Sequence, residues 1–129
     1  MKTSKGEQKI INILKKEKIA FVREQSFSGL KYKGHFLRFD FAAAINEEKI
    51  LIEWDGENHF ENVKFFNKDN WKHKLENDRR KNKFALLNGY TLYRIPYWEY
   101  DYIHTLADIM APRHKVKSIY HNDRLLPPK

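Results

Sequence analysis

Two strand-like segments joined by a short polar turn constrain the fold more than any other feature of the sequence. Residues 36–42 alternate between apolar and polar side chains, and residues 49–55 form an apolar run that stops at Gly56. Asn46 and Glu47 lie between the two segments and favour a hairpin turn. The apolar side chains of the first segment share one face; they are Leu37, Phe39 and Phe41. We therefore expect two neighbouring antiparallel strands near the middle of the chain.

The residues before this hairpin predict a helix and a further strand. Ser4 and Glu7 have the spacing of a capping box, which opens a helix that we expect to run to about Lys18. Residues 19–25 predict a first strand. Residues 26–35 contain two glycines and predict a loop or a distorted hairpin.

The residues after the hairpin predict a crossover to a fourth strand. A long basic helix should span about 70–88 and end at Gly89, followed by a strand over residues 90–95. A last helix is expected from about 99 to 110, before Pro112. The predicted order is α-β-β-β-α-β-α. It corresponds to an α/β fold with a mixed four-stranded central sheet flanked by helices.

Length and composition indicate one soluble domain. The chain has 129 residues, of which 41% are hydrophobic, enough for a single core. We place this domain at residues 1–112 and expect the basic C-terminal tail, residues 113–129, to be peripheral or flexible. Cysteine is absent, which excludes disulfide scaffolds, cysteine nucleophiles and thiolate zinc sites. Without an apolar run of about 20 residues or a signal peptide, we expect a cytoplasmic protein and no membrane partner.

Two carboxylates occupy strand positions that usually hold apolar side chains. Asp40 lies between two phenylalanines, and Glu53 follows three consecutive apolar residues. In the predicted hairpin they lie roughly opposite each other, and two such carboxylates would suit Mg²⁺, with Mn²⁺ as a substitute. We therefore predict a metal site at Asp40 and Glu53. The alternative is an edge strand whose polar face is simply in contact with solvent.

A histidine and an aspartate form a second candidate pair. His59 follows the second strand of the hairpin, in a loop where functional residues concentrate. On the predicted long helix, Asp78 shares the inward face of Trp71 and Leu75. An inward aspartate needs a partner, and a carboxylate can hold an imidazole in one orientation. The alternative is an ion pair between Asp78 and a neighbouring basic residue on the helix surface.

The excess of basic residues favours a polyanionic partner. Lysine and arginine number 25 against 17 aspartates and glutamates, a net charge of +8. Many basic residues lie on or just before the predicted long helix, with aromatic residues interleaved. The candidate DNA-binding residues are Lys64, Lys68, Lys72, Lys74, Arg79, Arg80 and Lys81. Basic residues beside a metal site point to phosphodiester cleavage.

These motifs resemble those of the very-short-patch-repair (Vsr-type) endonucleases. They are still more similar to those of the phage and homing endonucleases with the Glu-Asp-x-His-Asp signature. Both groups belong to the PD-(D/E)xK nuclease superfamily. The resemblance rests on Asp40, Glu53, His59, the run 76–82 and the segment 86–95. It covers about residues 7–100 and implies a restriction-endonuclease-like α/β/α sandwich in a bacterial or phage-infected cell.

By position, the resemblance implies a role for five acidic and histidine residues. Glu7 matches the first-helix glutamate, Asp40 the metal-binding aspartate and His59 the catalytic histidine. Asp78 matches the acid that supports this histidine, and Glu53 the second acid of the wider superfamily. The capping box also accounts for Glu7 on its own.

The sequence departs from the superfamily pattern at one position. The usual lysine of the third motif falls at Asp55, so the charge there is inverted. Either His59 takes over the work of that lysine, or Lys81 reaches in from the long helix as an alternative catalytic lysine. Vsr-type repair enzymes also hold a structural zinc with cysteine and histidine, and this chain has no cysteine.

The sequence thus predicts a Mg²⁺-dependent DNA endonuclease that nicks or cuts both strands. High site specificity would require a homodimer or a partner protein. Two alternatives remain open. One is a catalytically silent DNA-binding or partner-binding domain of the same fold, and the other is a nuclease for branched DNA or for RNA.

Overall fold

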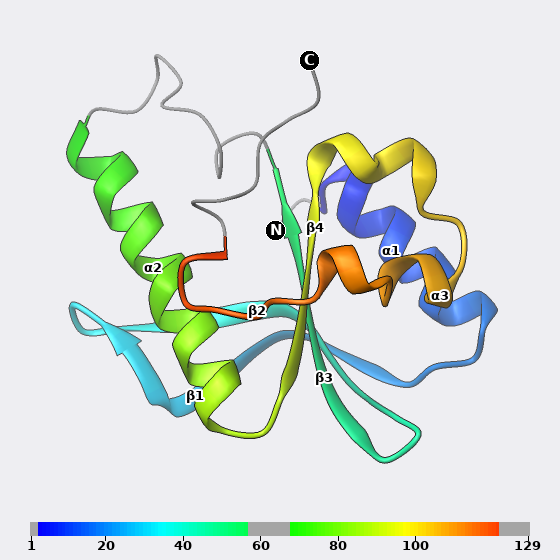
Figure 1. The fold of residues 1–129 in the computed structure, drawn as a ribbon, viewed down its shortest axis with the longest axis horizontal. Coiled ribbons are helices and arrows are strands. Elements are labelled where there is room, and N and C mark those ends of the chain that lie inside the picture. The colour runs from blue at the N-terminus through cyan, green and yellow to red at the C-terminus, as the bar shows by residue number, and fades with distance from the viewer. Residues whose placement is uncertain (1–2, 57–67, 122–129) are drawn as a thin grey trace.

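The computed structural model describes residues 3–56 and 68–121 (Figure 1). The regular elements, in chain order, are α1 (Lys5–Lys16), β1 (Phe21–Tyr32), β2 (His35–Ile45), β3 (Glu48–Asp55), α2 (Lys68–Leu87) and β4 (Thr91–Pro96). Three short helices follow: η2 (Tyr97–Tyr102), α3 (Leu106–Ile109) and η3 (Pro112–His114). The predicted helix–strand order is therefore confirmed as far as β4.

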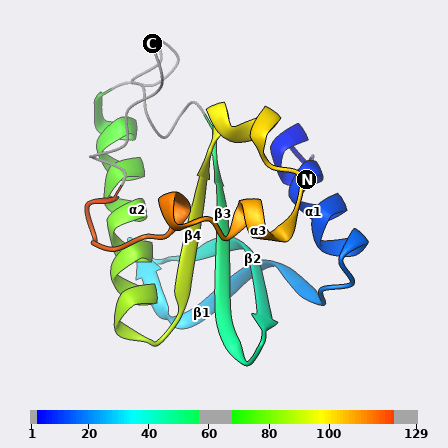
Figure 2. The same ribbon diagram turned by 45° about the vertical axis from the view of Figure 1, so that its right-hand side comes forward.

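The four strands form one sheet in the order β1-β2-β3-β4. β1 pairs with β2, and β2 with β3, in antiparallel fashion, whereas β3 and β4 are parallel. α2 makes the crossover between the two parallel strands, as such a connection requires. α2 lies on one side of the sheet, and α1 with α3 on the other (Figures 1 and 2). The predicted mixed four-stranded sheet with flanking helices is confirmed.

Alternate residues of β3 divide the core into two clusters. Ile50 and Ile52 pack on the side of α1, against Ile10 and Leu14. Leu51 faces the other side, in the cluster that includes Ala85 of α2. Because both faces of β3 are covered, the polar side chains that follow on this strand are buried as well.

Two tight turns set the register of the strands. Asn46 and Glu47 both have positive φ values, 51° and 67°, and join paired residues, as in a two-residue hairpin turn of type I′. This confirms the predicted hairpin. Lys33 and Gly34, with φ of 50° and 81°, make the same kind of turn between β1 and β2. Of the two alternatives expected over residues 26–35, the distorted hairpin is confirmed and the loop is wrong, because both strands continue up to this turn and their pairing shifts register between Ser26 and Lys31.

Gly29 and Gly34 explain why the sequence pattern did not predict the full length of β1 and β2. Gly34 supplies a positive φ in the turn, where it carries little steric cost. Gly29 lies where the pairing of β1 with β2 changes register, between Ser26 and Lys31, and its position faces the ring of Phe84. Such an irregularity breaks the alternation on which a strand prediction depends.

The two faces of β2 exchange at Asp40. Phe39 packs on the α2 side of the sheet, whereas Phe41 packs on the α1 side. The expected single face for Leu37, Phe39 and Phe41 is therefore wrong. The main-chain pairing of β2 with β3 reaches Phe41 and Ile52, and beyond it side chains take over the hydrogen bonds.

The chain after β4 also differs from the prediction. The helix expected from 99 to 110 is two short helices, because Thr105 begins α3 with a capping box of its own. The segment after residue 112 was expected to be peripheral, yet His114 and Val116 are buried. The amide of Val116 donates to the carbonyl of Leu92 at 2.9 Å. Residues 113–121 thus extend the domain, and residues 122–129 lie outside the described residues.

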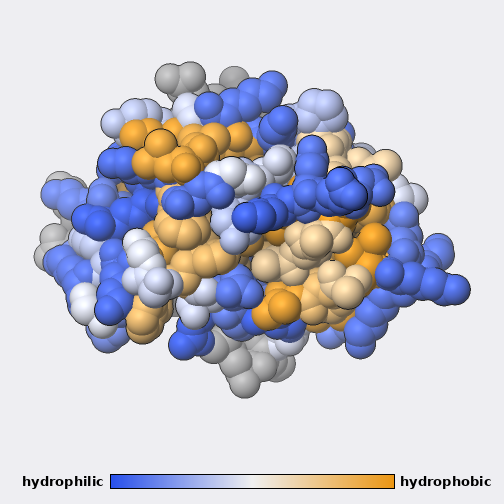
Figure 3. Space-filling view, turned by 90° about the horizontal axis from the view of Figure 1, so that it is seen from below, coloured by the Kyte–Doolittle hydropathy of each residue, from blue (hydrophilic) through white to orange (hydrophobic). Residues whose placement is uncertain are grey.

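The surface mixes apolar and hydrophilic areas. On the face shown in Figure 3, hydrophobic patches are separated by hydrophilic side chains. Among the residues that the structure describes, the exposed large hydrophobic side chains are Val22, Phe36, Leu86, Leu87, Tyr102 and Tyr120. The homodimer or partner protein expected from the sequence stays a prediction.

Candidate active site

Asp40 and Glu53 meet where β2 and β3 stop pairing through their main chains. The amide of Asp40 donates to Oε1 of Glu53 at 2.9 Å, and the amide of Trp54 donates to Oδ2 of Asp40 at 2.7 Å. The hairpin register therefore sets the two carboxylates opposite each other, as the sequence predicted. Both strands are internal to the sheet, so the alternative of an edge strand with a solvated polar face is wrong.

Burial makes the carboxyl group of Asp40 a weaker acid than that of an ordinary aspartate. The pKa of this carboxyl is raised from 3.8 to about 8, first by burial and then by the nearby charges of Glu53 and Glu7. The amide of Trp54 and the charge of Lys81 act in the opposite direction but do not outweigh burial. At neutral pH the isolated site therefore favours a proton on Asp40, and a bound cation would favour the carboxylate.

Asp40 also belongs to a group of three carboxylates. Oxygens of Glu7, Glu24 and Asp40 lie within 4.8 Å of one another, and all three side chains are half-buried. Glu7 comes from α1, where its Oε1 accepts from Ser4 Oγ at 2.9 Å in the predicted capping box. The capping role and the position at the site are thus compatible. Glu24 has a φ of 55° although it lies within β1.

The donor set of this group fits a hard divalent cation. Carboxylate oxygens are the ligands that Mg²⁺ favours, and half-buried positions leave room for water ligands. Glu53 is not part of this group. Its Oε1 accepts from the amide of Asp40 and its Oε2 from Nζ of Lys81. The metal pair expected from the sequence, Asp40 and Glu53, is therefore adjacent in space. Among the described residues, the group of three acids whose oxygens lie within 4.8 Å of one another is nevertheless Glu7, Glu24 and Asp40.

Arg23 supplies positive charge to the same carboxylates. Its Nη2 lies 2.8 Å from Oε2 of Glu7 and 3.7 Å from Oε1 of Glu24. This guanidinium offsets part of the repulsion among the acids. A cation that binds here would have to share Glu7 and Glu24 with Arg23 or displace it.

Lys81 reaches the site from α2. Its Nζ donates to Oε2 of Glu53 at 3.1 Å, and its side chain is only 14% exposed. Burial alone would lower the pKa of Lys81. The charge of Glu53, with smaller help from Asp78 and Asp40, outweighs burial, and the pKa is raised. Lys81 therefore carries a positive charge beside Glu53, and its role as an alternative catalytic lysine stays a prediction.

A buried arginine organises the residues behind this lysine. Nη1 of Arg94 lies 2.8 Å from Oδ1 of Asp55, and its Nε donates to Oδ1 of Asn82 at 2.7 Å. Its Nη2 lies 3.5 Å from Oδ1 of Asp78. Although burial alone would lower the pKa of Arg94, the charges of these acids raise it. Arg94 thus balances the charge of the buried Asp55.

This cluster changes the account of Asp78. The sequence suggested His59 as its partner, and the structure gives it an ion pair with Arg94. His59 and Lys64 lie outside the described residues, as does the side chain of Lys68. A pair between His59 and Asp78 therefore stays a prediction. The inward phase of Asp78 is confirmed, because its side chain is buried.

The other candidate DNA-binding residues lie along α2. Lys72 and Arg80 are exposed, whereas Lys74 and Arg79 are half-buried. Lys81 differs from them because it points inward to Glu53. α2 therefore supplies one lysine to the candidate site and further basic residues to the surface around it.

Sequence reasoning missed Glu24, Arg23 and Arg94. Arg94 had a usable signal, since it is a charged residue within the apolar strand β4, the same anomaly that identified Asp40. Glu24 and Arg23 had no such signal, because charged residues are ordinary in an amphipathic strand. Their importance comes from the pairing of β1 with β2, which brings them close to Asp40.

Comparisons with protein-family models, with curated proteins and with solved structures found no match to this chain. The case for function therefore depends on the geometry of the site itself. Among the described residues, no helix is both long enough and apolar enough to span a membrane.

Proposed function

We propose that this protein is a metal-dependent endonuclease that hydrolyses phosphodiester bonds in DNA, with a restriction-endonuclease-like α/β/α sandwich. One observation carries the proposal: Asp40, Glu53 and Lys81 meet at the point where two central strands separate. Two acids and a lysine form the catalytic set of the PD-(D/E)xK superfamily that the sequence resembles. In this proposal Lys81 of α2 supplies the lysine, whereas position 55 holds an aspartate.

Each of these residues has a distinct chemical role. Asp40, together with Glu7 and Glu24, would hold Mg²⁺ or Mn²⁺. The ion would polarise the scissile phosphate and lower the pKa of an attacking water. Glu53 fixes Lys81, and its second oxygen fixes the main chain of Asp40. Lys81 would stabilise the negative charge that develops on the phosphate. His59 remains a candidate for proton transfer.

A second candidate function has its own support in Arg23. This residue already pairs with Glu7 at 2.8 Å, so positive charge reaches the acidic group without a metal. A catalytically silent nucleic-acid-binding domain could use such an arrangement for stability alone. The two candidates differ in whether the protein cuts DNA.

Supercoiled plasmid, incubated with Mg²⁺, with Mn²⁺ or with EDTA, tests the proposal. Nicked or linear product should form with either metal and not with EDTA, and linear product would indicate two sites acting together in a dimer. Asp40→Asn should abolish cutting, because the amide cannot replace a charged metal ligand. Asp101→Asn is the matched control, since Asp101 is exposed and lies in η2, outside the site.

Plasmid that binds the protein yet stays supercoiled with every metal would contradict the nuclease and favour the silent domain. Equal cutting by Asp40→Asn and by Asp101→Asn would show that the site lies elsewhere. Cutting of RNA or branched DNA without cutting of plasmid would change the substrate and keep the chemistry.

A further inference from the structure

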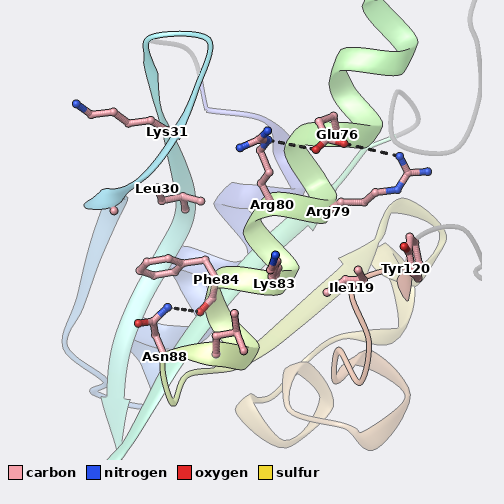
Figure 4. Close-up of a pocket in the computed structure, with 12 residues that line it drawn as sticks. Leu30, Lys31, Glu76, Arg79, Arg80, Lys83, Phe84, Asn88, Ile119 and Tyr120 are labelled. Carbon is pink, nitrogen blue, oxygen red and sulfur yellow. Dashed lines mark hydrogen bonds and ion pairs between the residues drawn. The ribbon is translucent and has the colours of Figure 1, made fainter.

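A basic groove runs along α2, on a face of the helix next to the one from which Lys81 reaches Glu53. It has a volume of about 750 Å³. It extends from the β1–β2 hairpin, at Lys31, across α2 to Tyr120 (Figure 4). Lys83 lies between these borders, and Phe84 contributes an apolar surface.

The side chains that line the groove give it a net positive charge, which favours a negatively charged ligand. Lys31, Arg79, Arg80 and Lys83 supply four positive charges. Glu76 is the one acid among the described lining residues, and it lies 3.2 Å from Arg80 and 3.8 Å from Arg79. The groove therefore keeps a clear excess of positive charge, which favours a polyanion.

The two arginines are held by aromatic rings on opposite sides of α2. The guanidinium of Arg80 lies 4.7 Å from the ring centre of Tyr32, and that of Arg79 lies 5.6 Å from the ring of Tyr120. Figure 4 shows Arg80 directed toward the hairpin and Arg79 toward Tyr120, with Glu76 between them. Planar guanidinium groups held in this way can form two hydrogen bonds with one phosphate.

Aromatic and basic residues together are typical of surfaces that follow a nucleic acid strand. Such surfaces neutralise phosphates with lysine and arginine and offer rings to bases or sugars. Tyr120 is 46% exposed, so its ring is available for contact. An acidic protein segment would use the charges but has less use for this ring.

We propose that this groove binds the phosphodiester backbone of a nucleic acid, with Lys31, Arg80 and Lys83 in contact with phosphates. The inference rests on the proposed function, because it supplies the path of the substrate beside the cutting site. Arg80 and Lys81 are consecutive on α2, so one turns to the groove and the other to Glu53. Consecutive residues lie about 100° apart around a helix, so the two surfaces are on adjacent faces of α2. One nucleic acid can therefore reach both.

The test measures the salt dependence of binding to a fluorescent DNA duplex and to the same sequence as a single strand. Anisotropy titrations in EDTA, at about 50 to 200 mM salt, exclude cutting and resolve the slope of log affinity against log salt. The groove variant is Lys31→Ala combined with Lys83→Ala. The matched control is Lys15→Ala with Lys16→Ala, which removes the same charge from the exposed last turn of α1.

The groove variant should flatten the slope by up to about 1.8 for duplex or 1.4 for single strand, for two lost contacts. At 0.1 M salt, these slopes correspond to binding that is weaker by about eightfold per contact for duplex and about fivefold for single strand. The control should keep the wild-type slope. Equal slopes for the two variants would overturn the inference, because charge alone would then explain binding. A groove variant that loses affinity for poly-glutamate but not for nucleic acid would also overturn it.

Binding in EDTA does not depend on cutting, so the two proposals can fail separately. A protein that binds through the groove but never cuts plasmid contradicts the nuclease and leaves the groove assigned. A protein that cuts plasmid while the groove variant binds like wild type contradicts the groove alone.

Discussion

In the absence of metal, the stability of Asp40→Asn relative to wild type should increase as pH rises from 5 to 8. In the folded protein the pKa of Asp40 is about 8, against 3.8 for the ordinary carboxyl. Between these values the folded state holds a proton that the unfolded chain has released. The free energy of unfolding of wild type therefore falls as pH rises, by up to about 1.4 kcal/mol per pH unit from this group. The variant has no such group, and its amide oxygen can still accept from Trp54.

From pH 5 to pH 8 the expected loss from this residue is about 4 kcal/mol. Urea unfolding of both proteins in EDTA, at intervals across this pH range, gives the free energy of unfolding of each as a function of pH. The loss is measured as the change in the difference between these two curves. Other titrating groups are common to both proteins and largely cancel. Asp101→Asn should follow wild type throughout, because that carboxyl is exposed. Parallel curves for wild type and Asp40→Asn would refute the reasoning.

Adding Mg²⁺ at pH 8 extends the same experiment to the metal. A cation replaces the proton on Asp40 and binds the folded state, so wild type should gain stability as RT ln(1 + [Mg²⁺]/Kd). At ten times Kd the gain is about 1.4 kcal/mol. Asp40→Asn should gain little. If Mg²⁺ stabilises both proteins equally, it binds away from this site.

The remaining predictions concern the lysine, the arginine behind it and the start of α1. At saturating DNA, Lys81→Met should cut about 10² to 10³ times more slowly than wild type, and Lys81→Arg should retain more activity. Loss of cutting in His59→Ala, with full activity in Lys81→Met, would instead assign the catalytic work to the histidine. Arg94→Met should lower the free energy of unfolding by about 3 to 5 kcal/mol in urea, because it leaves buried carboxylates without their partner; a loss under 1 kcal/mol would contradict this role. Gly6→Ala should lower the melting temperature clearly, since the added Cβ would lie 2.0 Å from Trp54 Cε2; an unchanged melting temperature would show that α1 shifts freely.

Local patterns in the sequence were enough to predict the sheet and its central hairpin. The turn at Asn46 and Glu47 fixes the register between its strands, and the register alone sets Asp40 opposite Glu53. The 3.6-residue period of α2 likewise predicts that Asp78 points inward. Each of these predictions depends on residues within one hairpin or one helix, where spacing determines which side chains share a face.

Features that depend on distant segments could not be predicted in this way. The exchange of faces in β2 occurs at Asp40, where side chains replace main-chain pairing with β3 and where Glu24 of β1 has a positive φ. Glu24 matters because β1 lies beside β2 and because α1 brings Glu7 to the same place. Arg94 and Asp55 form their ion pair across 39 residues of sequence. No spacing rule connects residues so far apart.

The hydrogen bonds between main chain and carboxylates give the site its own spectroscopic reporters. The amide of Asp40 donates to Glu53, and the amide of Trp54 donates to Asp40. The proton resonance of a hydrogen-bonded amide responds to the charge on its acceptor. Titration of Asp40, entry of a metal or a change of ligand would therefore shift two backbone signals in an isotope-labelled sample. Occupancy of the site becomes observable by NMR without substrate or turnover.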